Sequence, residues 1–336
     1  MRNKSTPPVI DTRHDVRLVI RSAGERTTSV AARLAVQCGV AADDITIVRE
    51  VPFELAVRAS YQEGIRAGRT WTMTLDADVL LNATAIADLI HCADQLPSHF
   101  LQLEGCVFDK ITGSYRQAGH RIYRTELLPL ALTQIPPPGI RIRPERFTLG
   151  QMIALGYPSR CVPEVVGLHD FEQNYADLYR KSVVHAKKHP YLLDDLLLRC
   201  ARQLHEDTDF LIILKGLWDG LRMPGTATID VRRYEDQARL AIQSVGLAEK
   251  APIADSDAGV RELTRLCDAI TSSQAVPQFA AFDKPPNPQD TPEAPQASGV
   301  SWIGKTRRRI TQHGPLRGAL ASIGALLRLA GQRLDA

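Results

Sequence analysis

The sequence predicts an α/β protein in which a mostly parallel sheet is flanked by helices. Residues 16–76 alternate strand-type and helix-type segments joined by short connections, a pattern typical of parallel strands linked by right-handed crossovers. The third strand-type segment, 70–81, is β-prone and reaches Asp76 and Asp78, as a buried strand does where its carboxyl end meets solvent. With 336 residues, 44% of them hydrophobic, the chain is long enough to bury a substantial core.

The elements before Asp76 are predicted by apolar spacing and by capping residues. Residues 16–24 form a strand and a small-residue turn, and Thr27 or Thr28 caps the helix that follows. Residues 45–49 form a second strand. The second helix ends at a glycine, and its apolar residues recur every four positions, at Phe53, Val57, Tyr61 and Ile65.

The elements after Asp78 continue the α/β pattern and then become helical. We expect a helix over 83–94, followed by strands over 100–108 and 120–124 with a turn at 109–114 between them. A helix over 144–155 comes next, and then an extended segment over 161–168 that ends at His169. Residues 171–204 are predicted to be mostly helical with a break near Pro190, and helices continue to about residue 272.

The composition divides the chain into five predicted parts. They are a flexible arm over 1–15, an α/β domain over 16–205, a helical extension over 206–273, a Pro-rich linker over 274–300 and a basic amphipathic tail over 301–336. The arm lacks a signal-peptide pattern, and no apolar run reaches the length of a membrane span. The six cysteines are scattered, so we expect a reducing, cytoplasmic environment with neither a disulfide frame nor a zinc site.

The basic residues of the tail set it apart from the rest of the chain. Residues 301–336 carry seven Lys/Arg and one Asp, whereas the remaining residues carry 34 basic and 37 acidic side chains, so nucleic acid is not an expected partner of the body. Apolar residues in the tail step by four and three along one seam. The seam fits a helix lying on an anionic membrane surface, such as the inner face of the cell membrane. It also fits a short self-association helix or a loosely docked tail.

Asp76 and Asp78 form the strongest candidate site in the sequence. In open α/β sheets, ligands bind outside the carboxyl ends of the strands. Two carboxylates one residue apart at such an edge can hold a hard divalent cation, which in turn can bind phosphate. The alternative is that they only end the strand and cap the helix near residue 83.

The order of these motifs resembles that of GT-A-fold glycosyltransferases, loosely those of family 2. The resemblance covers about residues 16–190. It rests on Arg21-Ser-Ala-Gly-Glu25 after the first strand, on Leu75-Asp-Ala-Asp-Val79 as the family's Asp-X-Asp motif, on the helix and Gly turn of 145–156, and on the position of His169. The chain departs from the family at Arg143-Pro-Glu-Arg146, where a Glu-Asp or Asp-Asp pair is usual. It also lacks the Gln-X-X-Arg-Trp motif of processive synthases.

The resemblance implies a GT-A-like fold for 16–205 and transfer of a sugar from a nucleotide-diphosphate donor to a glycan or lipid-linked acceptor. It implies that a Mn²⁺ or Mg²⁺ ion, held by Asp76, Asp78 and His169, neutralises the leaving diphosphate. His169 with Asp170 can instead cap the helix that follows.

The resemblance also implies roles for residues outside the metal site. It places four side chains in the nucleotide-sugar pocket, namely Arg21, Glu25, Glu50 and Asp76. The helix after His169 carries further cations, namely Arg180, Lys181, His185 and Lys188. They can reach the same phosphates if this helix folds back over the site. The alternative is that they form a solvated helix face and do not contact phosphate. Glu145 is the predicted catalytic base, followed by Glu104 and Asp109.

Two other functions fit the same motif. A haloacid-dehalogenase-like phosphatase also uses Asp-X-Asp after a strand, although there the motif normally opens the domain. A non-catalytic protein that binds nucleotide sugars would keep the fold without turnover.

Overall fold

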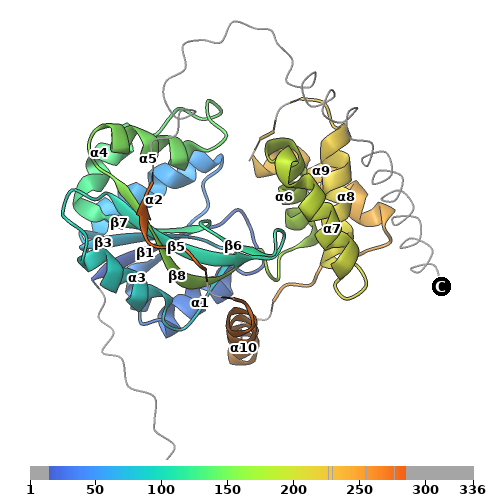
Figure 1. Ribbon diagram of the computed structural model, residues 1–336, viewed down its shortest axis with the longest axis horizontal. Helices are drawn as coiled ribbons and strands as arrows, with labels where there is room; N and C mark the ends of the chain where they lie inside the picture. Colours follow the sequence, from blue (N-terminus) through green and yellow to red (C-terminus); the bar gives the residue numbers. More distant parts are fainter. Residues whose placement is uncertain (1–14, 226, 229, 254–255, 276, 285–336) are drawn as a thin grey trace, which may run out of the picture. The chain divides into compact units, whose positions relative to one another are not determined.

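The structure is a computed structural model that describes residues 15–225, 227–228, 230–253, 256–275 and 277–284 (Figure 1). The chain divides into two compact units, whose described parts are residues 15–173 with 251–284, and residues 174–250. Nearly all of the predicted arm, most of the predicted linker and the whole predicted tail lie outside the described residues.

The first unit is built on one mixed sheet. Its strands are β1 (Val16–Arg21), β2 (Ile45–Val48), β3 (Trp71–Asp76), β4 (Val79–Leu81), β5 (Gln102–Asp109), β6 (Ser114–Arg116), β7 (His120–Arg124), β8 (Ser159–His169) and β9 (Phe282–Asp283). The order is β2-β1-β3-β7-β5-β8-β4, with β6 on β5 and β9 on β8. On this path β2, β1, β3, β5 and β8 run in the same direction, and β7 and β4 oppose them.

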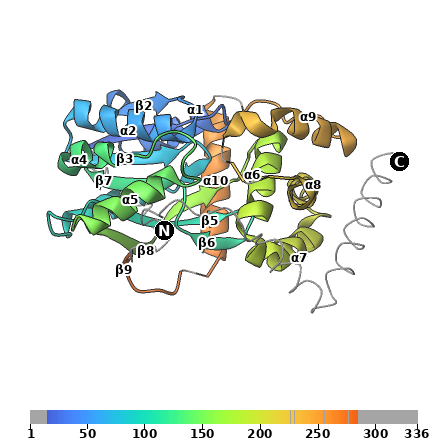
Figure 2. The ribbon, with the colours of Figure 1, turned by 90° about the horizontal axis from the view of Figure 1, so that it is seen from above.

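Helices cover both faces of this sheet. One face carries α2 (Phe53–Ala67), α4 (Leu128–Thr133) and α5 (Pro144–Ala154), and the other carries α1 (Thr28–Gln37), α3 (Ala85–Asp94) and α10 (Asp257–Ser273) (Figure 1). Figure 2 shows α10 crossing the direction of the strands. The larger hydrophobic core lies on the α1, α3 and α10 face. The α/β class predicted from the sequence is therefore confirmed.

Strand β3 shows how the sequence divides the two faces. Its apolar residues, Trp71, Met73 and Leu75, are buried in the larger core, while Thr72 points to the α2 face and shares a hydrogen bond of 2.8 Å with Thr125. Helix α2 approaches β3 closely because Gly64 has no side chain; a Cβ there would lie 2.2 Å from Oγ1 of Thr72. The alternation along β3 thus gives the sheet one apolar face and one partly polar face.

The second unit is helical. It contains α6 (Tyr175–Lys188), α7 (Leu193–Gln203), α8 (Asp209–Arg222) and α9 (Glu235–Ser244). Helix α6 packs against α8 at two glycines: a Cβ on Gly216 or Gly220 would come within 2.6 or 2.8 Å of a backbone oxygen of α6. Residues 174–205, predicted to belong with the α/β domain, therefore pack with the later helices. No helix among the described residues is long and apolar enough to cross a membrane.

Several short elements differ from the sequence predictions. The turn expected at 109–114 includes the start of β6, helix α4 falls where none was predicted, and residues 79–81 form a strand of their own that pairs with β8. Strand β9 lies inside the predicted linker and pairs with Arg160 and Cys161 of β8. These pairings rest on backbone hydrogen bonds, which composition does not reveal.

Candidate metal centre and its charged surroundings

The register of the sheet brings the predicted site residues to one edge. Arg21 and Asp76 are the paired last residues of β1 and β3. Asp109 and His169 are the paired last residues of β5 and β8. Because these four strands run in the same direction, their carboxyl ends meet at the same edge of the sheet, where α/β proteins bind ligands.

The Asp-X-Asp segment is a hydrogen-bonded turn between β3 and β4. The amide of Asp76 donates to the carbonyl of Gly119 at 2.6 Å, and the amide of Ala77 donates to the carbonyl of Arg21 at 2.9 Å. Neither aspartate caps α3, because the amide of Thr84 at that end donates to the Asn82 side chain instead. The capping alternative for Asp76 and Asp78 is therefore wrong.

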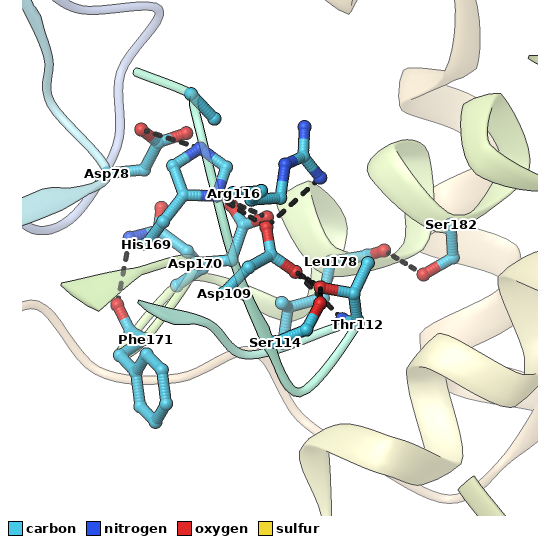
Figure 3. A network of polar contacts seen from close by, with 12 residues as sticks. Asp78, Asp109, Thr112, Ser114, Arg116, His169, Asp170, Phe171, Leu178 and Ser182 are labelled. Carbon is cyan, nitrogen blue, oxygen red and sulfur yellow. Dashed lines mark hydrogen bonds and ion pairs between the residues drawn. The ribbon is translucent and has the colours of Figure 1, made fainter. Parts of the chain in front are cut away.

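His169 lies at the centre of a cluster of three carboxylates (Figure 3). Its Nδ1 lies 2.8 Å from Oδ2 of Asp109 and 3.2 Å from Oδ2 of Asp170, and its Nε2 lies 3.6 Å from Oδ1 of Asp78. We call Asp78, Asp109, His169 and Asp170 the His169 cluster. All four are buried, and none caps the next helix, whose first amides donate to Glu249.

The charges of the cluster shift the titration of its members. Burial lowers the pKa of His169, but the carboxylates of Asp170 and Asp78 and the hydrogen bond to Asp109 raise it, to about 10. Burial raises the pKa of Asp109, but Arg116 and the hydrogen bond from His169 lower it, to about 2. Asp109 also accepts hydrogen bonds from the amide and hydroxyl of Thr112, at 2.8 and 3.0 Å, so its orientation is fixed.

Three members of the cluster fit a divalent cation. Asp78, His169 and Asp170 each offer a ligand atom, and these atoms all lie within 4.8 Å of one another. Two carboxylates with one imidazole suit Mn²⁺ or Mg²⁺, and the imidazole favours Mn²⁺. Asp170 reaches the site through a left-handed backbone conformation, with φ of 66°, and its amide donates to the carbonyl of Asp78 at 3.1 Å.

Asp76 is outside this set and belongs to a second charged group. Its Oδ1 accepts a hydrogen bond of 2.7 Å from Nε of Arg21, and Nη1 of Arg21 donates to Glu145 at 2.8 Å. Glu145 also accepts from Arg121 and, at 2.8 Å, from the hydroxyl of Tyr123. Arg121 then pairs with Glu104 at 3.0 Å, and Glu104 with Lys284. We call this alternating line the Glu145 network; its members are Asp76, Arg21, Glu145, Tyr123, Arg121, Glu104 and Lys284.

The Glu145 network bears on the predicted catalytic base. Burial raises the pKa of Glu145, but Arg121 and Arg21 lower it, to about 2, and both carboxylate oxygens accept hydrogen bonds. Glu104 and Asp109, the other candidates, are fully buried and ion-paired. Asp76 is the most exposed of these carboxylates, at 28% of its side chain. Burial raises the pKa of Asp76 and Arg21 lowers it, and the net shift is upward.

Other predicted site residues lie in three places. Glu25 accepts hydrogen bonds from the Ser22 hydroxyl and the Ala23 amide, so it braces the loop after β1, and Glu50 is exposed after β2. In the helical unit, Arg180 pairs with Asp177 at 3.0 Å. Two further cations, Lys181 and Lys188, also lie on α6 and have interaction partners of their own. Phosphate contacts by these cations stay predictions.

Sequence reasoning missed Asp170 as a ligand and Arg121 and Lys284 as network members. Asp170 directly follows His169, and a carboxylate next to a predicted metal ligand could have indicated a further ligand. Arg121 lies on β7, which runs antiparallel between β3 and β5, and only that register sets it opposite Thr74 of the motif strand. Lys284 lies in a Pro-rich segment that gave no signal.

Comparison with known proteins gives a weak structural similarity. No protein-family model and no curated protein matches the sequence. Among solved structures, the chain is similar to a glycosyltransferase involved in the glycosylation of the major capsid of PBCV-1, with 17% identity and a TM-score of 0.31, over 45% of this chain and 81% of that chain. A likeness of this size carries no argument about function.

Proposed function

We propose that the protein is a metal-dependent glycosyltransferase whose α/β unit binds a nucleotide-diphosphate sugar and whose acceptor is a glycan or a lipid-linked glycan. The observation that carries the proposal is the convergence of Asp78, His169 and Asp170, with ligand atoms within 4.8 Å of one another. They lie at the edge where β3 and β8 end. The order of motifs along 16–190 supports the same reading.

The metal requirement follows from the chemistry of the leaving group. A departing nucleoside diphosphate gathers negative charge as the glycosidic bond breaks, and a bound divalent ion supplies Lewis-acid stabilisation of that charge. Asp78, His169 and Asp170 would hold the ion. Asp109 would orient the imidazole, since it lies 2.8 Å from Nδ1 and is itself held by Arg116 and Thr112.

The Glu145 network would position the edge of the nucleotide pocket. Arg21 donates one hydrogen bond to Asp76 and one to Glu145, and Glu145 is also ion-paired with Arg121. The ring of Phe53 lies 4.9 Å from the guanidinium carbon of Arg21 and closes its other side. With a pKa of about 2 and both oxygens occupied, Glu145 is suited to positioning, and we propose this role for it in place of proton acceptance.

The test is metal-dependent donor binding by the full chain. Calorimetric titration with UDP- and GDP-sugars, each with and without Mn²⁺, is expected to show binding that depends on the ion. Asp78→Asn is expected to weaken the Mn²⁺-dependent binding by about 10-fold to 100-fold or more. Asp88→Asn, on the exposed side of α3, is the matched control and should leave it unchanged.

Two outcomes would replace the proposal. Hydrolysis of p-nitrophenyl phosphate without any binding of nucleotide sugars would favour the phosphatase alternative. Binding of a nucleotide sugar without transfer or hydrolysis would favour a non-catalytic binding protein. Absence of binding to any donor in the presence of Mn²⁺ would contradict the proposal altogether.

A further inference from the structure

The connection between α4 and α5 exposes isoleucines in alternation with arginines. Residues 140–143 read Ile-Arg-Ile-Arg, and the side chains of Ile140 and Ile142 are 65% and 42% exposed. Ile140 is the most exposed large aliphatic residue in the described part of the chain. Large apolar side chains grouped on a surface usually mark an interaction site.

This connection is held in a defined shape. The amide of Gly139 donates a hydrogen bond of 2.8 Å to Oε1 of the buried Glu54 on α2. Gly139 has φ of +79°, which turns the chain outward directly before Ile140. On the far side, the guanidinium carbon of Arg141 lies 4.6 Å from the ring centre of Phe147 on α5. Ile135 and Pro144 are buried and fix the two ends of the connection. Ile140 is therefore held in an exposed position by a connection whose ends are anchored.

The stretch of chain that carries the loop lacks acidic residues. No Asp or Glu occurs between Glu126 and Glu145. Two more leucines on the adjoining helices are exposed, Leu130 on α4 at 36% and Leu155 at the end of α5 at 53%. Helices α4 and α5 both pack with α2 on the same face of the sheet (Figure 1). The apolar residues and the arginines thus belong to one side of the first unit.

We infer that this loop docks on an anionic lipid surface. Ile140 and Ile142 would enter the boundary of the acyl chains, and Arg141 and Arg143 would lie at the level of the phosphate groups. The arginines that alternate with the exposed isoleucines, and the lack of Asp and Glu between Glu126 and Glu145, give this stretch a charge complementary to anionic lipid. The inference concerns where the protein is held and does not depend on the proposed glycosyl transfer.

The test must report on the loop itself, because the basic segment 301–336 can also bind vesicles. We would place a tryptophan in the full chain as Ile140→Trp and add phosphatidylglycerol vesicles that contain brominated lipid. The matched control is Val36→Trp on α1, which is 46% exposed on the opposite face of the sheet. Emission of the unmodified chain, which has three tryptophans, is subtracted.

The expected result is a blue shift and quenching of the emission added at position 140, with neither change at position 36. The double variant Ile140→Ser/Ile142→Ser is expected to partition about tenfold or more weakly onto these vesicles; Val36→Ser/Leu240→Ser is its control. Vesicle binding without a change at position 140 would overturn the inference, and so would the absence of vesicle binding. A dimer in solution that Ile140→Ser dissociates would overturn it in favour of self-association.

Discussion

The two charged groups at the edge of the sheet differ in how their charges are matched. In the Glu145 network, each carboxylate faces a guanidinium or an ammonium: Asp76 faces Arg21, Glu145 faces Arg21 and Arg121, and Glu104 faces Arg121 and Lys284. In the His169 cluster, three carboxylates converge on one imidazole. In the first group, three carboxylates are therefore paired with three cations. In the second group, the carboxylates raise the pKa of His169 to about 10, and Arg116 pairs with Asp109.

This difference indicates that the Glu145 network supports the fold and that the His169 cluster offers a binding site. A buried charge whose partner is removed is strongly destabilising, so the Glu145 network is expected to govern stability. A divalent ion can replace the proton of an imidazolium that lies among carboxylates, so the His169 cluster is expected to govern metal binding.

Removing the centre of the network should have the largest effect. Glu145→Gln removes the carboxylate that the buried Arg21 and Arg121 share, and we expect a loss of about 3–5 kcal/mol in the free energy of unfolding. Urea denaturation measures it, with Glu126→Gln, on the exposed turn before α4, as the control. A loss below about 1 kcal/mol would show that the network does not carry stability.

The His169 cluster should make metal affinity depend on pH. With a pKa of about 10, His169 is protonated at neutral pH and must release its proton to bind an ion. We therefore expect Mn²⁺ affinity to rise about 100-fold from pH 6 to pH 8. The electron paramagnetic resonance signal of the free ion measures this affinity. An affinity that is constant over this range would place the ion away from His169.

The same histidine should give the metal-free protein a distinctive pH dependence. A pKa raised from 6.5 to about 10 contributes stability in full below pH 6.5, and that stability is lost as pH rises through 10. The low pKa of Glu145 stabilises the fold in full above pH 4.5, so the contribution of Glu145 is constant in this window. Urea denaturation from pH 6.5 to 10 should show a decline that His169→Gln removes. A decline of equal slope in the variant would assign it to another group.

A smaller effect is expected at Gly119, which lies against the His169 cluster. A Cβ there would come within 2.5 Å of Cγ2 of Val79 and 3.1 Å of Cδ2 of His169, and φ is +71°. We expect Gly119→Ala to cost about 1–3 kcal/mol of stability and to weaken Mn²⁺ binding. Gly68→Ala is the matched control, because Gly68 has φ of +66° with nothing within 4 Å. Equal Mn²⁺ affinity in both variants would show that the position does not shape the metal site.

Local patterns were sufficient to predict much of the first unit. The apolar run that ends at Arg21 and the four-residue spacing of α2 each reflect burial of one face, which the sequence records directly. Asp78 and His169 were also expected together, although they are 91 positions apart, because both follow strands and the resemblance joins them. Their approach to 3.6 Å shows that the strand ends meet as expected.

The remaining site residues depend on register and backbone conformation. Asp170 enters the cluster because one left-handed residue follows β8. Arg121 meets both Glu104 and Glu145 because β7 runs against its two neighbours. Lys284 reaches Glu104 through a two-residue strand in a Pro-rich segment. Such placements arise from tertiary pairing, and composition and periodicity do not encode them.

The most direct test of the account is the position of a bound ion. Anomalous scattering from crystals of the full chain soaked in Mn²⁺ locates it without reference to activity. The account predicts a peak at ligand distance from Asp78, His169 and Asp170, with Asp76 still paired to Arg21. No peak at this edge, or a peak held by Asp76 without His169, would contradict it.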